Sequence, residues 1–142
     1  MHLSAGFNRN AERRREPFVL TVLLAALFSF VATGTSHAAG DAAKGRSAFV
    51  RQCAICHTIE KGDPNRFGPN LFGIVGKKAG AVQEFDYSRA FKSAANWEWS
   101  EDALASWIMF PGVMVPGTAM AIFQGVAEKD RDDIVAYLAS KK

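Results

Sequence analysis

Two cysteines and a histidine within five residues constrain the fold of this chain more than any other feature. They are Cys53, Cys56 and His57 in the segment Cys-Ala-Ile-Cys-His, and the 142-residue sequence holds no other cysteine. On a helical turn, cysteines three residues apart can each reach one edge of the same porphyrin, and the adjoining histidine projects over the ring centre. This spacing is the attachment signature of a c-type haem. The motif predicts a chain folded around one covalently attached haem c and its iron.

Three competing roles for the cysteine pair fit the sequence less well. A thioredoxin-like redox pair lies next to a strand–helix–strand pattern, which this sequence lacks. A closed zinc site needs about four ligands, and the chain has no second pair of cysteine and histidine residues to complete it. A structural disulfide across so short a loop would be strained and would leave His57 without a role. A thiol oxidoreductase is the least favoured function, because attached haem leaves no free thiol.

The N-terminal segment has the pattern of an export signal. Residues 1–18 contain a cluster of arginines, an apolar run of 14 residues extends from Val19 to Ala32, and small and polar residues follow up to Ala38. A secretory signal has this order, and the run is shorter than the roughly 20 residues that span a bilayer. We expect residues 1–38 to be a cleaved signal peptide, with an uncleaved membrane anchor as the alternative. Residues 39–142 are then a periplasmic domain.

The charge balance argues against nucleic-acid binding. The whole chain has a formal net charge of +3, but four of its 17 Lys and Arg residues and two of its 14 acidic residues precede Ala39. The remaining domain has 13 basic and 12 acidic side chains. Nucleic-acid-binding proteins need a clustered surplus of positive charge, so this class is excluded.

Polar caps and hydrophobic spacing predict an all-α domain. Four helices are expected: over residues 42–52 after Asp41, from Asp86 or Ser88 to Ala94, from Ser100 to Pro111-Gly112, and from about residue 128 to 140. Glycine and proline residues recur between 58 and 80, which is typical of loops. No segment alternates apolar and polar residues for long enough to build a sheet. Because long loops in so small a domain usually wrap something, we expect a single domain of short helices and loops around the haem.

Without the predicted signal peptide, the chain keeps one histidine that could ligate the iron. The three histidines are His2, His37 and His57, and the first two are lost with residues 1–38. A haem with two histidine ligands from one chain is therefore excluded, as are catalytic triads that need a second base. The second axial ligand must be softer or absent, and methionine is the obvious candidate.

The exported domain offers three methionines for that position. Met109 lies within an apolar helix, which favours a packing role. Met114 lies between two valines and could pack or ligate. Met120 follows Pro116-Gly117-Thr118, a rigid segment suited to presenting a thioether at a fixed point.

At these residues the chain resembles a known family. The shared marks are Cys53-Ala54-Ile55-Cys56-His57-Thr58, Gly68-Pro69-Asn70-Leu71, Tyr87, Trp99, Pro116-Gly117-Thr118-Ala119-Met120 and Ala136-Tyr137-Leu138. Over about residues 40–140 the chain is similar to class I cytochromes c, close to the mitochondrial and short alpha-proteobacterial type. The resemblance implies the class I cytochrome c fold, with His57 and Met120 as axial ligands of the iron.

The resemblance also implies roles for residues around the haem. The carbonyl of Pro69 would accept the second ring N–H of His57 and fix its orientation. Tyr87 and the indole of Trp99 would donate hydrogen bonds to a haem propionate, and Thr118 would support the loop that bears Met120. Trp107 stands where the family usually has tyrosine, and both core packing and tuning of the methionine remain open for it.

Three departures from the family pattern stand out. Lys77 replaces a frequent propionate-binding arginine, and Phe91 replaces a polar residue, which should make that corner drier. The lysines that usually surround the haem edge are largely missing. An apolar docking face is suggested instead by five residues: Val113, Met114, Val115, Ala121 and Ile122.

The resemblance implies an electron carrier and not an enzyme. A monomeric, soluble, single-haem protein would pass one electron from a membrane cytochrome bc complex to a terminal oxidase or photosynthetic reaction centre, through transient contacts and without a small-molecule substrate. Two alternatives stay open: a membrane-tethered cytochrome c, and a haem peroxidase-like enzyme if Met120 does not ligate the iron.

Overall fold

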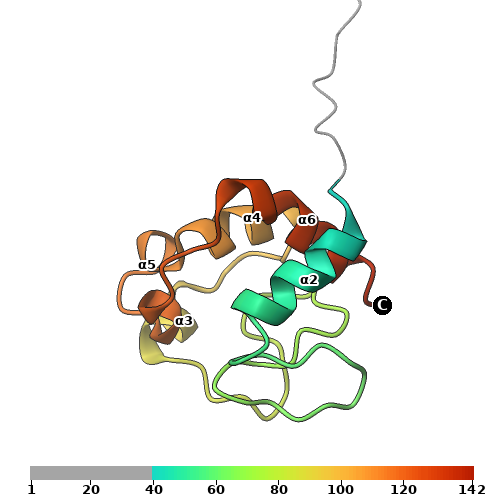
Figure 1. Ribbon diagram of the computed structural model, residues 1–142. Coiled ribbons are helices and arrows are strands. Elements are labelled where there is room, and N and C mark those ends of the chain that lie inside the picture. Colours follow the sequence, from blue (N-terminus) through green and yellow to red (C-terminus); the bar gives the residue numbers. More distant parts are fainter. Residues whose placement is uncertain (1–39) are drawn as a thin grey trace, which may run out of the picture. The chain divides into compact units, whose positions relative to one another are not determined.

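A computed structural model describes residues 40–142 (Figure 1). The helices are α2 (Ala42–Gln52), α3 (Arg89–Ala94), α4 (Glu101–Met109), α5 (Pro111–Met114), the 3-10 helix η2 (Ala119–Ile122) and α6 (Glu128–Ala139). Within this range the only β-type pairing is an isolated bridge between Lys78 and Glu98. The all-α prediction is confirmed for the domain. The predicted signal and its cleavage site lie outside the described residues.

Side-chain caps start the helices where the sequence predicts. The carboxylate of Asp41 accepts hydrogen bonds from the backbone N–H groups of Ala43 and Lys44 at the start of α2. Ser88 and Ser100 cap α3 and α4 in the same way, which satisfies backbone donors that have no partner inside a helix.

One helix boundary differs from the expectation. The sequence predicts that Pro111 ends the helix that begins after Ser100, and α4 does end at Met109. Pro111 then opens a further helical turn, α5, in its first position. The reason is that proline's fixed φ and missing N–H cost nothing at the start of a helix.

The first and last helices of the domain pack against each other, side by side in Figure 1. A Cβ atom on Gly45 would lie 1.8 Å from the backbone oxygen of Asp133, so only glycine allows this approach. Phe49 and Tyr137 meet with ring centroids 5.5 Å apart, and Ile134 is completely buried. The contact fixes α2, which leads directly into the cysteine motif.

The segment after α5 folds back onto α4. The backbone N–H of Val126 donates to the oxygen of Ile108 at 3.0 Å. Gly125 has a φ of +89°, and a Cβ there would lie 2.2 Å from the backbone oxygen of Met109. Only glycine meets both conditions, and the turn leads the chain from η2 towards α6.

Hydrogen bonds from one asparagine organise the loops between α2 and α3. The side-chain amide of Asn70 donates to Thr58 Oγ1 at 2.8 Å and to the backbone oxygens of Glu60 and Asp63 at 3.0 and 3.1 Å. The backbone N–H of Asn70 in turn donates to Asn65 Oδ1 at 2.8 Å. Buried loop backbone needs such partners, and here they hold the residues after His57 in place.

No helix within residues 40–142 has both the length and the apolar character needed to cross a membrane.

Candidate cofactor site

A largely apolar cleft opens between the motif helix, the loops and η2. The lining residues are Gln52, Cys53, Cys56, His57, Phe67, Gly68, Phe85, Tyr87, Ser88, Phe91, Trp99, Trp107, Thr118, Ala119, Met120, Ile122 and Phe123. Among the residues predicted to form the site, Pro69 alone does not line the cleft. The topology therefore brings together predicted site residues that lie up to 67 positions apart in the sequence, from Cys53 to Met120.

The cysteine motif forms a tight turn at the end of α2. The backbone N–H groups of Cys56 and His57 both donate to the oxygen of Cys53, at 3.0 and 2.9 Å. Burial, followed by the nearby Cys56, raises the pKa of the Cys53 thiol to about 12. A thiol with so high a pKa is protonated at neutral pH.

Gly68 and Pro69 hold His57 in place. Its Nδ1 lies 2.8 Å from the carbonyl oxygen of Pro69, the contact that the sequence predicts. A carbonyl only accepts, so Nδ1 carries the proton and Nε2 keeps its lone pair. Burial lowers the pKa of His57, and the Pro69 hydrogen bond offsets part of this shift. The lowered pKa favours the neutral form. A Cβ on Gly68 would lie 2.2 Å from His57 Cε1, so the ring fits only beside glycine.

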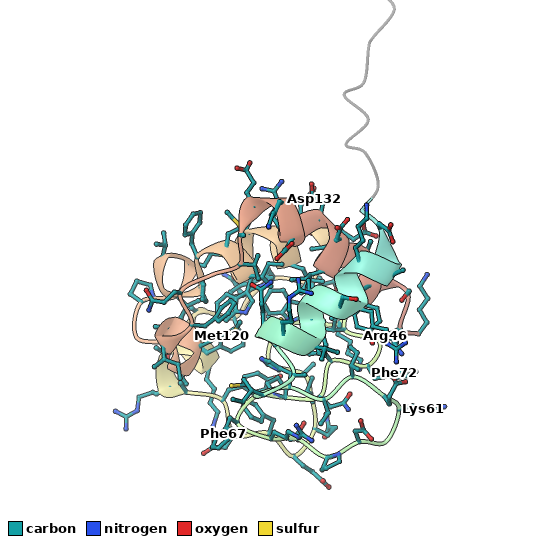
Figure 2. The ribbon with its side chains drawn as sticks, in the orientation of Figure 1. Arg46, Lys61, Phe67, Phe72, Met120 and Asp132 are labelled. Atoms are coloured by element: carbon teal, nitrogen blue, oxygen red, sulfur yellow. The ribbon has the colours of Figure 1, made fainter. Side chains whose placement is uncertain are left out.

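Met120 lies in η2 with its sulfur fixed by an indole. The Nε1–H of Trp107 donates to Met120 Sδ at 3.0 Å. Figure 2 labels Met120 among the side chains between α2 and the helices on the left of the view. The sequence leaves both core packing and tuning of the methionine open for Trp107. In the structure Trp107 is buried in the core and also contacts the methionine directly. A thioether has a second lone pair that remains for a metal.

The other two methionines do not line the cleft. Met109 packs against the hydrophobic core from α4, and Met114 is 37% exposed at the end of α5. Met120 is therefore the one of these three methionines that lines the cleft.

One wall of the cleft consists of stacked aromatic rings. Tyr87 stacks on Phe91 with centroids 5.0 Å apart, and Phe91 meets Trp107 edge-on at 5.3 Å. Trp99 lies 5.6 Å from Trp107. Burial raises the pKa of Tyr87, partly offset by a hydrogen bond with the backbone of Val82. Tyr87 and Trp99 thus bring an O–H and an N–H donor to an otherwise apolar wall, and buried Thr118 closes the side next to Met120.

Two positions differ from what the sequence suggests. Lys77, which stands in the place of a propionate-binding arginine, does not line the cleft, and its Nζ donates to the backbone oxygen of Phe72 at 2.8 Å. Val115, expected on an exposed apolar face, is 2% exposed and belongs to the core. Its neighbours Val113 and Met114 face outward because α5 turns Val115 inward.

Trp97 also belongs to this aromatic cluster and is not among the residues predicted to form the site. Its ring lies 5.4 Å from Trp99 and 5.7 Å from Phe91. Among the described residues, its Nε1 is the one buried side-chain nitrogen or oxygen without a hydrogen-bond partner. The signal is present in the sequence, because Trp97 and Trp99 alternate and point to the same side of an extended segment.

The residues of the cleft fit a porphyrin. Two sulfur atoms one helical turn apart, a neutral imidazole with a free Nε2, and a thioether face a water-poor space with few polar donors. Together with the all-α fold, this donor set defines a small c-type haem protein.

Comparison with known proteins agrees with that class. The family model described as "Cytochrome c" matches residues 42–142. The chain is 41% identical over 99 residues to a cytochrome c of Stellaria longipes, covering 70% of this chain and 91% of that protein. It is 43% identical over 102 residues to a cytochrome c of Gibberella zeae, covering 71% and 94%. A cytochrome c of Theileria annulata is 44% identical over 100 residues, covering 70% and 84%. The chain belongs to the cytochrome c family.

Membership settles the cofactor and the general activity. The protein carries one covalently attached haem c, for which Cys53 and Cys56 are present. It is an electron carrier and not an enzyme. The haem supplies one-electron redox chemistry, and the chain supplies ligands, orientation and exclusion of water.

Proposed function

We propose that this protein is a periplasmic carrier that takes one electron from a membrane cytochrome bc complex and delivers it to a terminal oxidase or a photosynthetic reaction centre. His57 and Met120 are the axial ligands of this proposal. Cys53 and Cys56 form the thioether links, and Tyr87 and Trp99 hold a propionate. The export signal predicted for residues 1–38 supports the periplasmic location.

The observation that carries the proposal is the fixed position of both ligand side chains. The hydrogen bond to Pro69 orients His57, and the bond from Trp107 orients Met120. Neither ligand has to rearrange between redox states, which favours rapid electron transfer over substrate chemistry at an open iron. The thioether and the apolar walls favour the ferrous state and raise the reduction potential.

Absorption spectra of the haem-loaded protein test the ligand assignment. We expect Met120→Ala to lose the weak long-wavelength band of methionine–iron ligation and to bind added imidazole far more tightly. Met114→Ala is the matched control, because Met114 does not line the cleft, and it should keep the band. A band that persists in Met120→Ala would reject the assignment, and a wild type without the band would favour the peroxidase-like alternative.

Two further measurements test the carrier role and its location. Purified protein should be reduced by a cytochrome bc complex and reoxidised by a terminal oxidase or reaction centre, and failure with every acceptor would contradict the shuttle. Mass spectrometry of protein from an export-competent host should show a chain that begins at Ala39. A mass that retains residues 1–38 would instead support the membrane-tethered alternative.

A further inference from the structure

Exposed apolar side chains line the cleft or lie on the segments next to its lining residues, and we call them the apolar rim: Ile55, Phe67, Val113, Met114 and Ile122. Phe67 and Ile122 line the cleft, and yet they are 86% and 83% exposed. Figure 2 shows Phe67 on the same side of the domain as Met120, away from Lys61 and Phe72. Large apolar groups this exposed, and gathered around a functional opening, mark an interaction site.

One continuous uncharged segment supplies most of the rim. No residue from Ala103 to Ala127 is Asp, Glu, Lys or Arg. Within it, α5 packs against η2, and a Cβ on Gly112 would lie 3.3 Å from the Cβ of Ala121. Val113, 77% exposed, and Ile122 are therefore parts of one surface and not isolated side chains.

Cations on the segments beside the mouth are mostly held by the protein's own acceptors. Arg51 Nη2 lies 3.8 Å from Asp130 Oδ2, and Arg66 Nη1 donates to the oxygen of Ala54 at 3.0 Å. Arg89 is exposed at the start of α3. Arg51 alone of the three is paired with a carboxylate, and the other two arginines are too few to form a ring of positive charge around the mouth, so a partner with an acidic docking face finds few counter-charges here.

We propose that the apolar rim is the docking face for a redox protein whose own surface, around its redox centre, is apolar and uncharged. This inference rests on the proposed carrier function and names its partner class. Charge complementarity favours such a partner over an acidic protein and over an anionic membrane, which attracts basic segments. The cleft opens within the rim, so docking there brings the two redox centres close. A lasting dimer of this chain through the same face would cover the opening and block transfer.

Stopped-flow kinetics of haem-loaded variants test this proposal. The probes are two blue-copper electron-transfer proteins, one with an apolar docking face and one whose face carries carboxylates. We expect Val113→Lys/Ile122→Lys to lower the second-order rate with the apolar probe by roughly tenfold and to raise the rate with the acidic probe. Val50→Lys is the matched control. Val50 is 62% exposed on α2 and does not line the cleft, so both rates should stay near the wild-type values.

The reduction potential and the absorption spectrum must match those of the wild type, which shows that the cofactor is intact. Equal effects of the rim and control variants would overturn the docking proposal while leaving the carrier function in place. Sedimentation that shows a dimer broken by Ile122→Lys would replace it with a second copy of the chain. Binding to lipid vesicles that Ile122→Lys abolishes would replace it with a membrane. A wild type that exchanges electrons with neither probe nor membrane complex would reject the carrier function itself.

Discussion

At the scale of single residues, two hydrogen bonds determine what the cleft can do. Pro69 accepts the Nδ1 proton of His57, and Trp107 donates its indole N–H to Met120 Sδ. The first contact leaves a nitrogen lone pair on His57, and the second leaves one sulfur lone pair on Met120. The chain thus presents one imidazole and one softer thioether to the cleft, each with its orientation fixed by a neighbouring residue.

Substitution of Trp107 by phenylalanine should weaken methionine ligation. The loss of one neutral hydrogen bond is worth about 0.5–1.5 kcal/mol. We therefore expect added imidazole to displace Met120 from the ferric protein with a dissociation constant roughly 2- to 12-fold lower than in the wild type. Titration followed by absorption measures this change.

The control for that titration is Trp97→Phe. Trp97 contacts the same aromatic cluster but has no hydrogen bond to Met120. Equal imidazole affinities in the two variants would show that Trp107 acts through packing alone.

The candidate ligands can be named from the sequence, but not all of their supports can. His57 is a candidate because the sequence after residue 38 holds no other histidine, and the Pro69 contact follows from the family resemblance. The bond from Trp107 cannot be predicted, because an indole on α4 can either pack or donate, and only its orientation decides. The contact of Lys77 is equally open, since its long side chain can reach a nearby backbone oxygen as easily as the cleft.

At the scale of helices, the N-terminal caps are the most predictable features. Ser88 and Ser100 each accept a backbone hydrogen bond from the residue three positions later, a local geometry that sequence alone specifies. The burial of Val115 depends instead on α5 turning against η2 and the core, which is a tertiary effect. The predicted exposed apolar face therefore wrongly includes Val115.

The cap of α2 makes a pH-dependent contribution to stability. Hydrogen bonds from the backbone of Lys44 and Ala43 lower the pKa of Asp41 below its usual 3.8. Because the folded pKa is the lower one, the stabilisation is present above the unfolded value and is lost as pH falls through the folded value. Asp41→Asn keeps an oxygen acceptor but does not titrate. We expect the wild type to have the higher urea midpoint at about pH 7, and the difference to shrink as the pH falls below 3.8.

Comparison of the two proteins in the same buffers removes the effects of every other acidic group. A difference in midpoint that stays constant over this pH range would show that the charge on Asp41 does not contribute through the cap.

At the scale of the whole molecule, the near balance of charge predicts weak electrostatic steering. The domain after residue 38 has 13 basic and 12 acidic side chains. Rates of electron transfer with a membrane partner should therefore fall less than about threefold between roughly 0.02 and 0.5 M ionic strength. Stopped-flow measurements over a salt series check this expectation, and a fall of several orders of magnitude would contradict it.

The contact between α2 and α6 also bears on the order in which the protein matures. α6 contributes no residue to the cleft lining, but it covers Gly45 and Phe49 on the helix that ends at the cysteines. Translation adds α6 last, long after Cys53 and Cys56 have been made. Until α6 is made, the helix that carries the attachment sulfurs lacks its main packing partner, so the two sulfurs take up their final position only once the far end of the domain has folded.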